Sequence, residues 1–187
     1  PKAPGGEQPL PEGVFYLLLT GDMPEREHVD EVREEWRRRS AVPAHVLRGL
    51  DALPTDLHPM TALSIGVLLS RRDAVFAARY QAGMNRQDYW EATYEDCMDL
   101  LARLPRIAAY IYRKAYHGDA QIEPDATLDW AANFAHMMGV ANDEYKELMR
   151  LYLVLHCDHD GGSVSGHATH LVGSALADCY YSLSAGL

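Results

Sequence analysis

Apolar positions recur at spacings of three and four along most of the chain, which is the period of an amphipathic helix. Residues 25–39 show this pattern clearly, because Val29, Val32 and Trp36 form one apolar stripe in an otherwise charged stretch. Such a helix lies on the surface with its stripe toward the core. Residues 60–70 differ, since they carry almost no charge. A helix that is apolar nearly all round is buried in a core or against a partner.

Turn residues divide the pattern into separate helices. Prolines and glycines in residues 1–11 predict an irregular lead-in, because proline cannot continue a helix or donate a backbone hydrogen bond. Asp125 and Asn142 are the expected N-caps of two helices, and Pro43 is expected in the first turn of a third. No convincing strand or repeat is found, so the predicted fold class is all-α. The predicted helices are residues 12–20, 25–39, 43–52, 60–70, 73–81, 88–116, 128–138, 142–157, 164–176 and 180–187.

The helix predicted at residues 88–116 is long, roughly 40 Å at a rise of 1.5 Å per residue. It contains Pro105, which removes one hydrogen bond and clashes one turn back, so we predict a kink near residues 101–105. Asp96 and Asp99 stand three positions apart on this helix. We expect them to be solvated or paired with Arg103, without a chemical role.

Composition narrows the classes of protein to which the chain can belong. Its 187 residues are 48% hydrophobic and 24% charged, which is ordinary for one compact soluble domain. The net charge of −10, without a basic stripe, argues against binding to nucleic acid. No run approaches the roughly 18 apolar residues of a membrane span. Cys97, Cys157 and Cys179 follow no disulfide or CxxC spacing, so we expect reduced thiols in an intracellular compartment.

Residues 156–170 hold four of the nine histidines around a Gly161-Gly162 pair. The two glycines let the backbone approach a ligand closely. Ser163 or Ser165 can cap the helix that follows, whose free N–H groups favour an anion. The chemistry of the chain is therefore expected at this turn between two helices.

Spacing alone leaves three interpretations of this turn open. Two pairs of histidines, at 156 and 159 and at 167 and 170, are three apart and can share a helical face in a metal site. No HExxH or paired-cysteine pattern accompanies them. Histidines in such places also cap helices and satisfy buried backbone groups. The third interpretation is recognition of a small anionic substrate by imidazole groups.

A resemblance to a known family favours the third interpretation. The run HCDHDGGSVSGHATHLVGSALAD at residues 156–178 is similar to the signature of eukaryotic-type citrate synthases, His-x-Asp-His-Glu-Gly-Gly-Asn-x-Ser-x-His followed by Leu-Val-Gly-Ser-Ala. Further segments resemble the family in the same order, so that the resemblance covers essentially the whole chain: PKAPGGEQPLPEG, LPTDLHPM, YWEATYEDCMDLLARLP, LDWAANF and ELMRLYLVLH.

The resemblance implies an all-α, multi-helical fold in which residues 1–187 form part of the large domain. It implies an acyltransferase that condenses acetyl-CoA with oxaloacetate to give citrate and coenzyme A. The family is homodimeric, and the eukaryotic-type signature implies the mitochondrial matrix, with the targeting segment expected outside these residues. No metal and no covalently bound cofactor are expected, since acetyl-CoA and oxaloacetate are the co-substrates.

The resemblance also implies roles for three residues. His159 matches the oxaloacetate-binding histidine, which helps to hold the substrate in a near-attack pose. Ser163 stands where the family usually has asparagine near the substrate. Arg86 matches an arginine that reaches the coenzyme A phosphate held mainly by the other subunit, a task that suits a guanidinium. Asp160 in place of glutamate and Cys179 in place of proline are further departures from the family pattern.

No catalytic residue is expected within this segment. The family's catalytic histidines, its aspartate and its substrate-clamping arginines are expected beyond Leu187, so residues 1–187 alone are predicted to be inactive. We expect the dimer face at residues 59–70, 86–116, 164–176 and 180–187, where small residues keep several helices thin. Two alternatives stay open: a catalytically silent structural or assembly module derived from this family, and a 2-methylcitrate synthase that uses propionyl-CoA.

Overall fold

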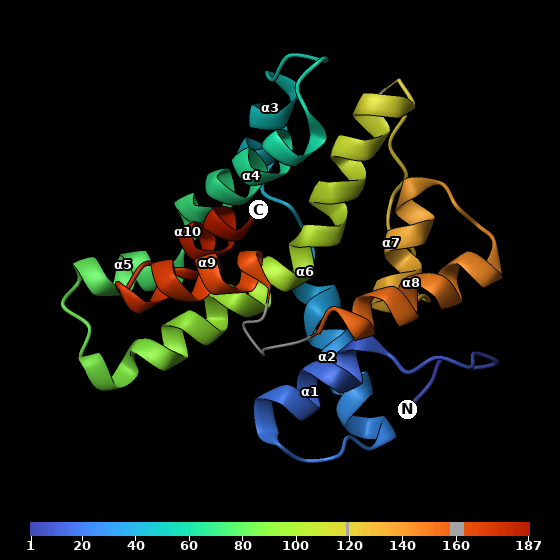
Figure 1. Cartoon of the computed structure of the whole chain (residues 1–187), viewed down its shortest axis with the longest axis horizontal. Helices are drawn as coiled ribbons and strands as arrows, with labels where there is room; N and C mark the ends of the chain where they lie inside the picture. Colours follow the sequence, from blue (N-terminus) through green and yellow to red (C-terminus); the bar gives the residue numbers. More distant parts are fainter. Residues whose placement is uncertain (119, 158–162) are drawn as a thin grey trace.

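The computed structural model describes residues 1–118, 120–157 and 163–187. Over these residues the chain is all-α, as predicted, and the one extended pairing among them is an antiparallel bridge between Lys2 and Pro9. Figure 1 shows the arrangement of the helices. In chain order they are α1 (Pro11–Thr20), α2 (Arg26–Arg39), α3 (Ala44–Asp51), α4 (Pro59–Ser70), η1 (Arg71–Asp73), α5 (Val75–Gln81), η2 (Arg86–Asp88), α6 (Tyr89–Tyr116), α7 (Trp130–Met138), α8 (Asp143–Leu155), α9 (Val164–Ser174) and α10 (Cys179–Gly186).

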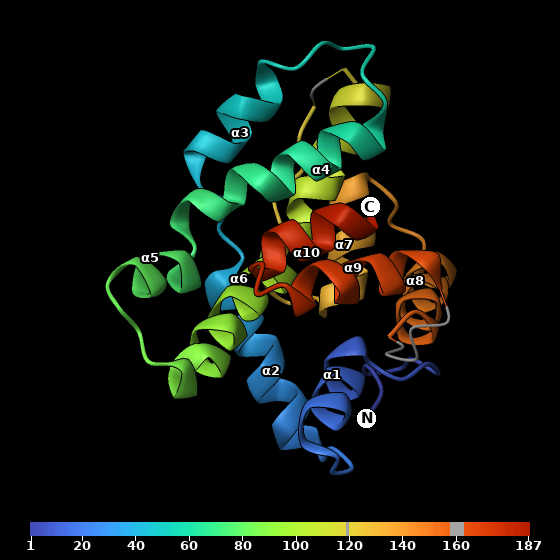
Figure 2. The same cartoon turned by 60° about the vertical axis from the view of Figure 1, so that its left-hand side comes forward.

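The long helix α6 is the centre of the packing. It contacts α2, α4, α5, α7 and α10, and its buried side chains recur along its full length, among them Met98, Ile107 and Ile111. Figures 1 and 2 show that α6 changes direction near its middle, in the region of Pro105. The predicted kink is therefore present, and it lets the two halves of one helix pack against different neighbours.

Helix α4 crosses α6 closely because it presents a glycine at the contact. A Cβ atom added at Gly66 would lie 2.9 Å from Cγ2 of Ile107. The buried residues of α4 are Ala62, Gly66, Val67 and Ser70. Leu68 remains exposed. Leu63 and Leu69 are half-buried against the same core, and α4 contacts α3, α6 and α10. The exposed part of α4 is therefore limited to residues 60, 61 and 68.

Of the two predicted N-caps, the structure confirms one and contradicts the other. Asn142 caps α8, as predicted, by accepting a hydrogen bond from the backbone N–H of Glu144 at 2.7 Å. The prediction for Asp125 was wrong, because α7 is capped by Asp129, whose carboxylate accepts from the N–H of Ala132 at 3.0 Å. Asp125 instead accepts from the N–H of Thr127 at 2.8 Å, within the preceding turn.

Asp96 is neither solvated nor paired with Arg103, so this prediction was also wrong. Its side chain is buried, and its carboxylate accepts hydrogen bonds from the N–H groups of Val75 and Phe76 at 2.7 and 3.0 Å. Asp96 therefore caps the N-terminus of α5 from a different helix. Burial raises its pKa, and the two hydrogen bonds act in the opposite direction. The neighbouring Asp99 does pair with Arg103, at 3.0 Å.

Replacement of Asp96 by alanine is expected to lower the free energy of unfolding by about 1–2 kcal/mol, because two N–H groups of α5 lose their acceptor. Urea unfolding followed by helical circular dichroism measures this loss. The variant Asp96→Asn keeps one acceptor oxygen and should lose less. Equal stability of Asp96→Ala and the wild-type chain would show that α5 does not depend on this cap.

Candidate functional site

Helices α8 and α9 frame the segment in which the sequence places the chemistry. His159, the predicted oxaloacetate-binding residue, lies outside the described residues. The structure describes the two flanks of this segment, which are His156 at the end of α8 and Ser163 at the start of α9. The candidate site is therefore built from these flanks and from the contacts that hold α8 and α9 in place.

Ser163, one of the two serines that the sequence offers as a cap, is the N-cap of α9. Its Oγ accepts a hydrogen bond from the backbone N–H of Gly166 at 3.0 Å, and the residue is exposed. A serine hydroxyl that accepts one bond still has a proton to donate. The first N–H groups of α9 have no acceptor within the helix. This helix end can therefore offer both hydroxyl and backbone donors to an anion.

The other histidines of the cluster are not gathered into a visible metal site. His156 is exposed, with its Nδ1 2.7 Å from the carbonyl oxygen of Tyr152 and its ring centroid 4.1 Å from that of Tyr152. His167 and His170 are exposed on α9. Within the described ranges, no group of three or more His, Cys, Asp or Glu side chains is placed to hold a metal ion.

Arg86, the predicted coenzyme A contact, lies at the start of η2 and is exposed. The turn before α6 is held by aromatic contacts, because the ring of Tyr89 packs edge-on against Phe76 at 5.4 Å and tilted against Tyr80 at 5.9 Å between ring centroids. In Figures 1 and 2 the loop that leads into α6 lies well apart from the start of α9. The structure therefore does not bring Arg86 and Ser163 together within one chain.

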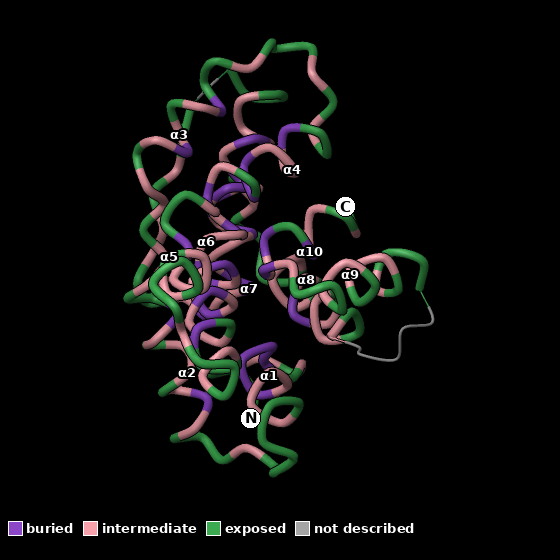
Figure 3. Tube along the Cα trace, turned by 90° about the vertical axis from the view of Figure 1, so that its left-hand side faces the viewer, coloured by how far each residue is buried: buried purple, intermediate pink, exposed green. Residues whose placement is uncertain are grey.

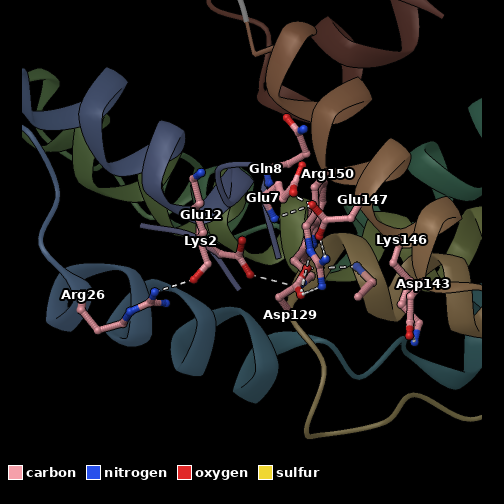
Figure 4. Close-up of polar contacts among 12 residues, drawn as sticks. Lys2, Glu7, Gln8, Glu12, Arg26, Asp129, Asp143, Lys146, Glu147 and Arg150 are labelled. Atoms are coloured by element: carbon pink, nitrogen blue, oxygen red, sulfur yellow. Dashed lines mark hydrogen bonds and ion pairs between the residues drawn. The ribbon is translucent and has the colours of Figure 1, made fainter. Parts of the chain in front are cut away.

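A buried ion pair fixes α8, the helix that leads into the candidate site. Arg150 on α8 donates from Nε and Nη2 to one carboxylate oxygen of Asp129 at 3.1 and 2.5 Å (Figure 4). Both residues are buried, with 8% and 5% of their surface exposed. Because Asp129 also caps α7, a single carboxylate joins the start of α7 to the middle of α8.

Glu147 extends this cluster to the N-terminal lead-in. Its carboxylate pairs with Arg150 and accepts hydrogen bonds from the N–H groups of Glu7 and Gln8 at 2.8 and 2.9 Å (Figure 4). Burial alone would raise the pKa of Glu147, but these three interactions together hold it below its ordinary value. Two hydrogen bonds to a charged carboxylate therefore tie the lead-in to α8.

Glu12 is a buried carboxyl group beside this cluster. It has 0% exposure, and its Oε1 accepts from the N–H of Trp130 at 2.9 Å, whereas Oε2 has no hydrogen-bond partner among the described residues. Burial raises its pKa to about 7, and the charge of Asp129 adds to this effect. At neutral pH a large share of the folded chains therefore carry a proton on Glu12.

The sequence reasoning missed this whole cluster. One signal was available, because Arg150 is the lone charge in the run LMRLYLVL, and an arginine on an apolar face requires a buried partner. Glu12 offers no comparable signal. A separate apolar cavity of about 110 Å³ lies between α2, α6 and α7, and neither Ser163 nor Arg86 lines it. In the part of the chain that the structure describes, no helix is both long and apolar enough to cross a membrane.

Comparison with known sequences identifies similar proteins along the whole chain. The family model described as "Citrate synthase, C-terminal domain" matches residues 6–187. The mitochondrial citrate synthases of Kajikia audax and Xiphias gladius are each 51% identical over 188 residues, covering 100% of this chain and 40% of the relative. The chain thus spans about two fifths of the length of these curated relatives.

Comparison with solved structures gives similar folds. Citrate synthase from Pyrobaculum aerophilum matches with a TM-score of 0.83 and 28% identity, over 94% of this chain and 44% of that chain. A citrate synthase from Thermoplasma acidophilum, solved as a ternary complex with carboxymethyl coenzyme A and oxaloacetate, matches with a TM-score of 0.76 and 21% identity. That match covers 97% of this chain and 45% of the other, and at this identity it speaks for the fold alone.

Proposed function

The chain belongs to the citrate synthase family, and we propose that it forms part of an enzyme that condenses acetyl-CoA with oxaloacetate to give citrate and coenzyme A. The observation that carries this proposal is 51% identity to mitochondrial citrate synthases along the entire chain. Since both relatives are mitochondrial, we assign the chain to the mitochondrial matrix. We further assign residues 1–187 to the large domain of the enzyme.

We assign the binding of oxaloacetate to His159 and Ser163. A dicarboxylate needs donors that are fixed before it arrives, because ordering them during binding reduces affinity. The anchoring of α8 through Arg150 and the capping of α9 by Ser163 support this assignment. The first contact fixes α8 against the start of α7, and the second orders the first turn of α9.

We assign Arg86 to the phosphate of a coenzyme A molecule bound mainly by a partner subunit. Its exposure supports the assignment, as does the distance between its loop and the start of α9 in both views (Figures 1 and 2). A guanidinium stays charged at every physiological pH and grips phosphate through several donors. An exposed guanidinium can therefore reach a phosphate that a partner subunit presents.

A homodimer is part of the same proposal. None of the residues of α9 is buried (Figure 3). Val164 and Leu171 on this helix are 87% and 67% exposed, and large apolar side chains so placed favour coverage by another protein surface. A second copy of the chain would cover α9 and the exposed side of α4, two of the segments predicted to form the dimer face.

Kinetics of the complete gene product test the residue assignments. His159→Ala is expected to raise the KM for oxaloacetate roughly tenfold to a hundredfold, because a hydrogen bond to a charged group is lost. Arg86→Ala is expected to raise the KM for acetyl-CoA and to leave that for oxaloacetate unchanged. With a coenzyme A analogue that lacks the contacted phosphate, Arg86→Ala should have no effect.

The same kinetic measurements can distinguish citrate synthase from the two alternative functions. A complete product that binds neither substrate and forms no citrate would indicate a structural module, and a preference for propionyl-CoA would indicate a 2-methylcitrate synthase. Residues 1–187 alone are expected to form no citrate, because enolisation of a thioester requires a base and a donor to the enolate oxygen that we assign to other parts of the enzyme. Citrate formation by this segment alone would contradict that division of roles.

A further inference from the structure

The kink of α6 lies in the wall of the cavity between α2, α6 and α7. Pro105 has no N–H group, so the carbonyl of Leu101, one turn back, loses its donor within the helix. Nε1 of Trp130 on α7 donates to this carbonyl at 3.1 Å. Pro105 and Trp130 both line the cavity of about 110 Å³. A directed hydrogen bond therefore holds this part of the wall in place, in addition to packing.

The body of the cavity is apolar. The rings of Trp36 and Trp130 contact each other with their centroids 5.3 Å apart, and Leu128 and Met137 add aliphatic surface to the lining. An engineered apolar cavity of roughly 150 Å³ in another protein takes up benzene. The present cavity is smaller, at about 110 Å³, so it suits a compact apolar group of about four to six heavy atoms.

The neutral polar side chains of the lining already have backbone partners. Asn133 accepts from the N–H of Asp125 and donates to the carbonyl of the same residue, both at 3.0 Å. The hydroxyl of Ser40 donates to the carbonyl of Arg37 at 2.8 Å. Among the described residues, no aspartate or glutamate lines the cavity. The charged groups that can meet a ligand there are therefore guanidinium groups.

Three arginines line the cavity, and each also forms an ion pair with a carboxylate outside the lining. The pairs are Arg33–Asp30 at 2.7 Å, Arg37–Glu34 at 2.6 Å and Arg106–Glu123 at 2.8 Å. The three carboxylate side chains are 43%, 50% and 76% exposed, and exposed pairs are weak. A guanidinium has five N–H donors, and one carboxylate engages at most two of them in a bidentate pair. Donors therefore remain for a second anion, above all on Arg106, whose partner is the most exposed.

We propose that this cavity binds a small monocarboxylate with a compact apolar body, of the class of short branched-chain carboxylates. The apolar body packs against Trp36 and Trp130, and the carboxylate pairs with Arg106. None of the residues assigned above to oxaloacetate or coenzyme A lines the cavity, so the proposal goes beyond the proposed reaction.

The experiment measures binding of isovalerate to the complete gene product by calorimetry and by tryptophan fluorescence. We expect a Kd on the order of 1 mM and a change in emission, because two tryptophans line the cavity. Isoamyl alcohol has the same apolar body without the charge, and acetate has the charge without the body. Each should bind at least roughly tenfold more weakly than isovalerate, because each lacks one of the two complementary parts.

Matched variants locate the site. Arg106→Gln should weaken isovalerate roughly tenfold and leave isoamyl alcohol unchanged, because only the carboxylate loses a partner. Arg79→Gln is the control, since Arg79 also forms an exposed pair, with Glu91 at 3.0 Å, and does not line the cavity. This variant should bind isovalerate as the wild-type protein does. Ala102→Val adds volume to the lining and should weaken both ligands.

The proposal is overturned if the wild-type protein binds isovalerate no better than acetate, or no better than isoamyl alcohol. Equal Kd values of Arg106→Gln and Arg79→Gln for isovalerate would also overturn it. The comparison of the three ligands needs no substitution, so a variant that fails to fold does not affect that result.

Discussion

Replacement of Asp129 by alanine is expected to lower the free energy of unfolding by about 3–5 kcal/mol, because it leaves the buried charge of Arg150 without its main partner. Asp129 accepts two hydrogen bonds from Arg150 and also caps α7, so the substitution removes two functions of one carboxylate. Urea unfolding followed by helical circular dichroism measures the loss. Tryptophan fluorescence should report the same transition, since Trp130 follows Asp129 directly.

The control for this prediction is a solvent-exposed ion pair on α8, the helix that carries Arg150. Asp143 pairs with Lys146 at 2.8 Å in the first turn of α8 and is exposed. Asp143→Ala should change stability little, because exposed pairs gain little from their attraction. If Asp129→Ala and Asp143→Ala lowered the free energy of unfolding by the same amount, burial of the ion pair between Asp129 and Arg150 would contribute nothing to stability. The double variant Asp129→Ala with Arg150→Met should recover part of the loss, because the buried unpaired charge of Arg150 is removed and Glu147 keeps its two backbone hydrogen bonds.

The second large effect is expected at Glu12 and depends on pH. The pKa of Glu12 in the folded chain is about 7, against an ordinary value of 4.5. Between these values the folded chain keeps a proton that the unfolded chain releases, so stability falls as pH rises from about 4.5 to about 7 and then levels off. The raised pKa of Glu12 corresponds to a free energy of unfolding that is lower above pH 7 than at pH 4 by on the order of 3 kcal/mol.

Glu12→Gln should remove this loss, since an amide keeps an acceptor oxygen for the N–H of Trp130 and cannot ionise. The variant is expected to match the wild-type chain near pH 4 and to exceed its stability at pH 8. Urea unfolding at several pH values provides the comparison, with the exposed Glu27→Gln as the matched control. Parallel pH profiles for Glu12→Gln and the wild-type chain would show that Glu12 does not carry this dependence.

The helices themselves could be predicted from the sequence, because their periodicity and their turn residues are local. The stripe of Val29 and Trp36 is an example, since both side chains are buried on α2 as the spacing predicts. Local sequence rules failed for side chains whose partners come from a helix far away in the sequence. Asp125 and Asp129 are equally good caps by sequence, and the buried Arg150, which comes from another helix, selects Asp129. The spacing of Asp96 and Asp99 on their helix indicates a solvent-exposed face, yet the start of α5 packs on Asp96 and donates a hydrogen bond to it.

The candidate site was predictable in part for the same reason. The local sequence predicts a serine cap at residue 163 or 165, and the structure selects Ser163. The separation of Arg86 from α9 depends on the path of α6 through the whole fold, which no local pattern describes. The roles of His159, Ser163 and Arg86 rest on resemblance to the family and stay predictions. The burial of Glu12 arises only when several helices have assembled.

The central place of α6 also has a consequence for protein synthesis. Because α6 packs against both α2 and α10, its surface cannot be completed until α10 has emerged from the ribosome. Until then the apolar site that receives Tyr180, formed by Val67 on α4 and Leu100 on α6, has no cover. Transiently exposed apolar surface of this kind is where aggregation begins and where chaperones bind. We therefore expect a nascent chain stalled before α10 to depend on chaperones far more than one stalled after α10 has emerged.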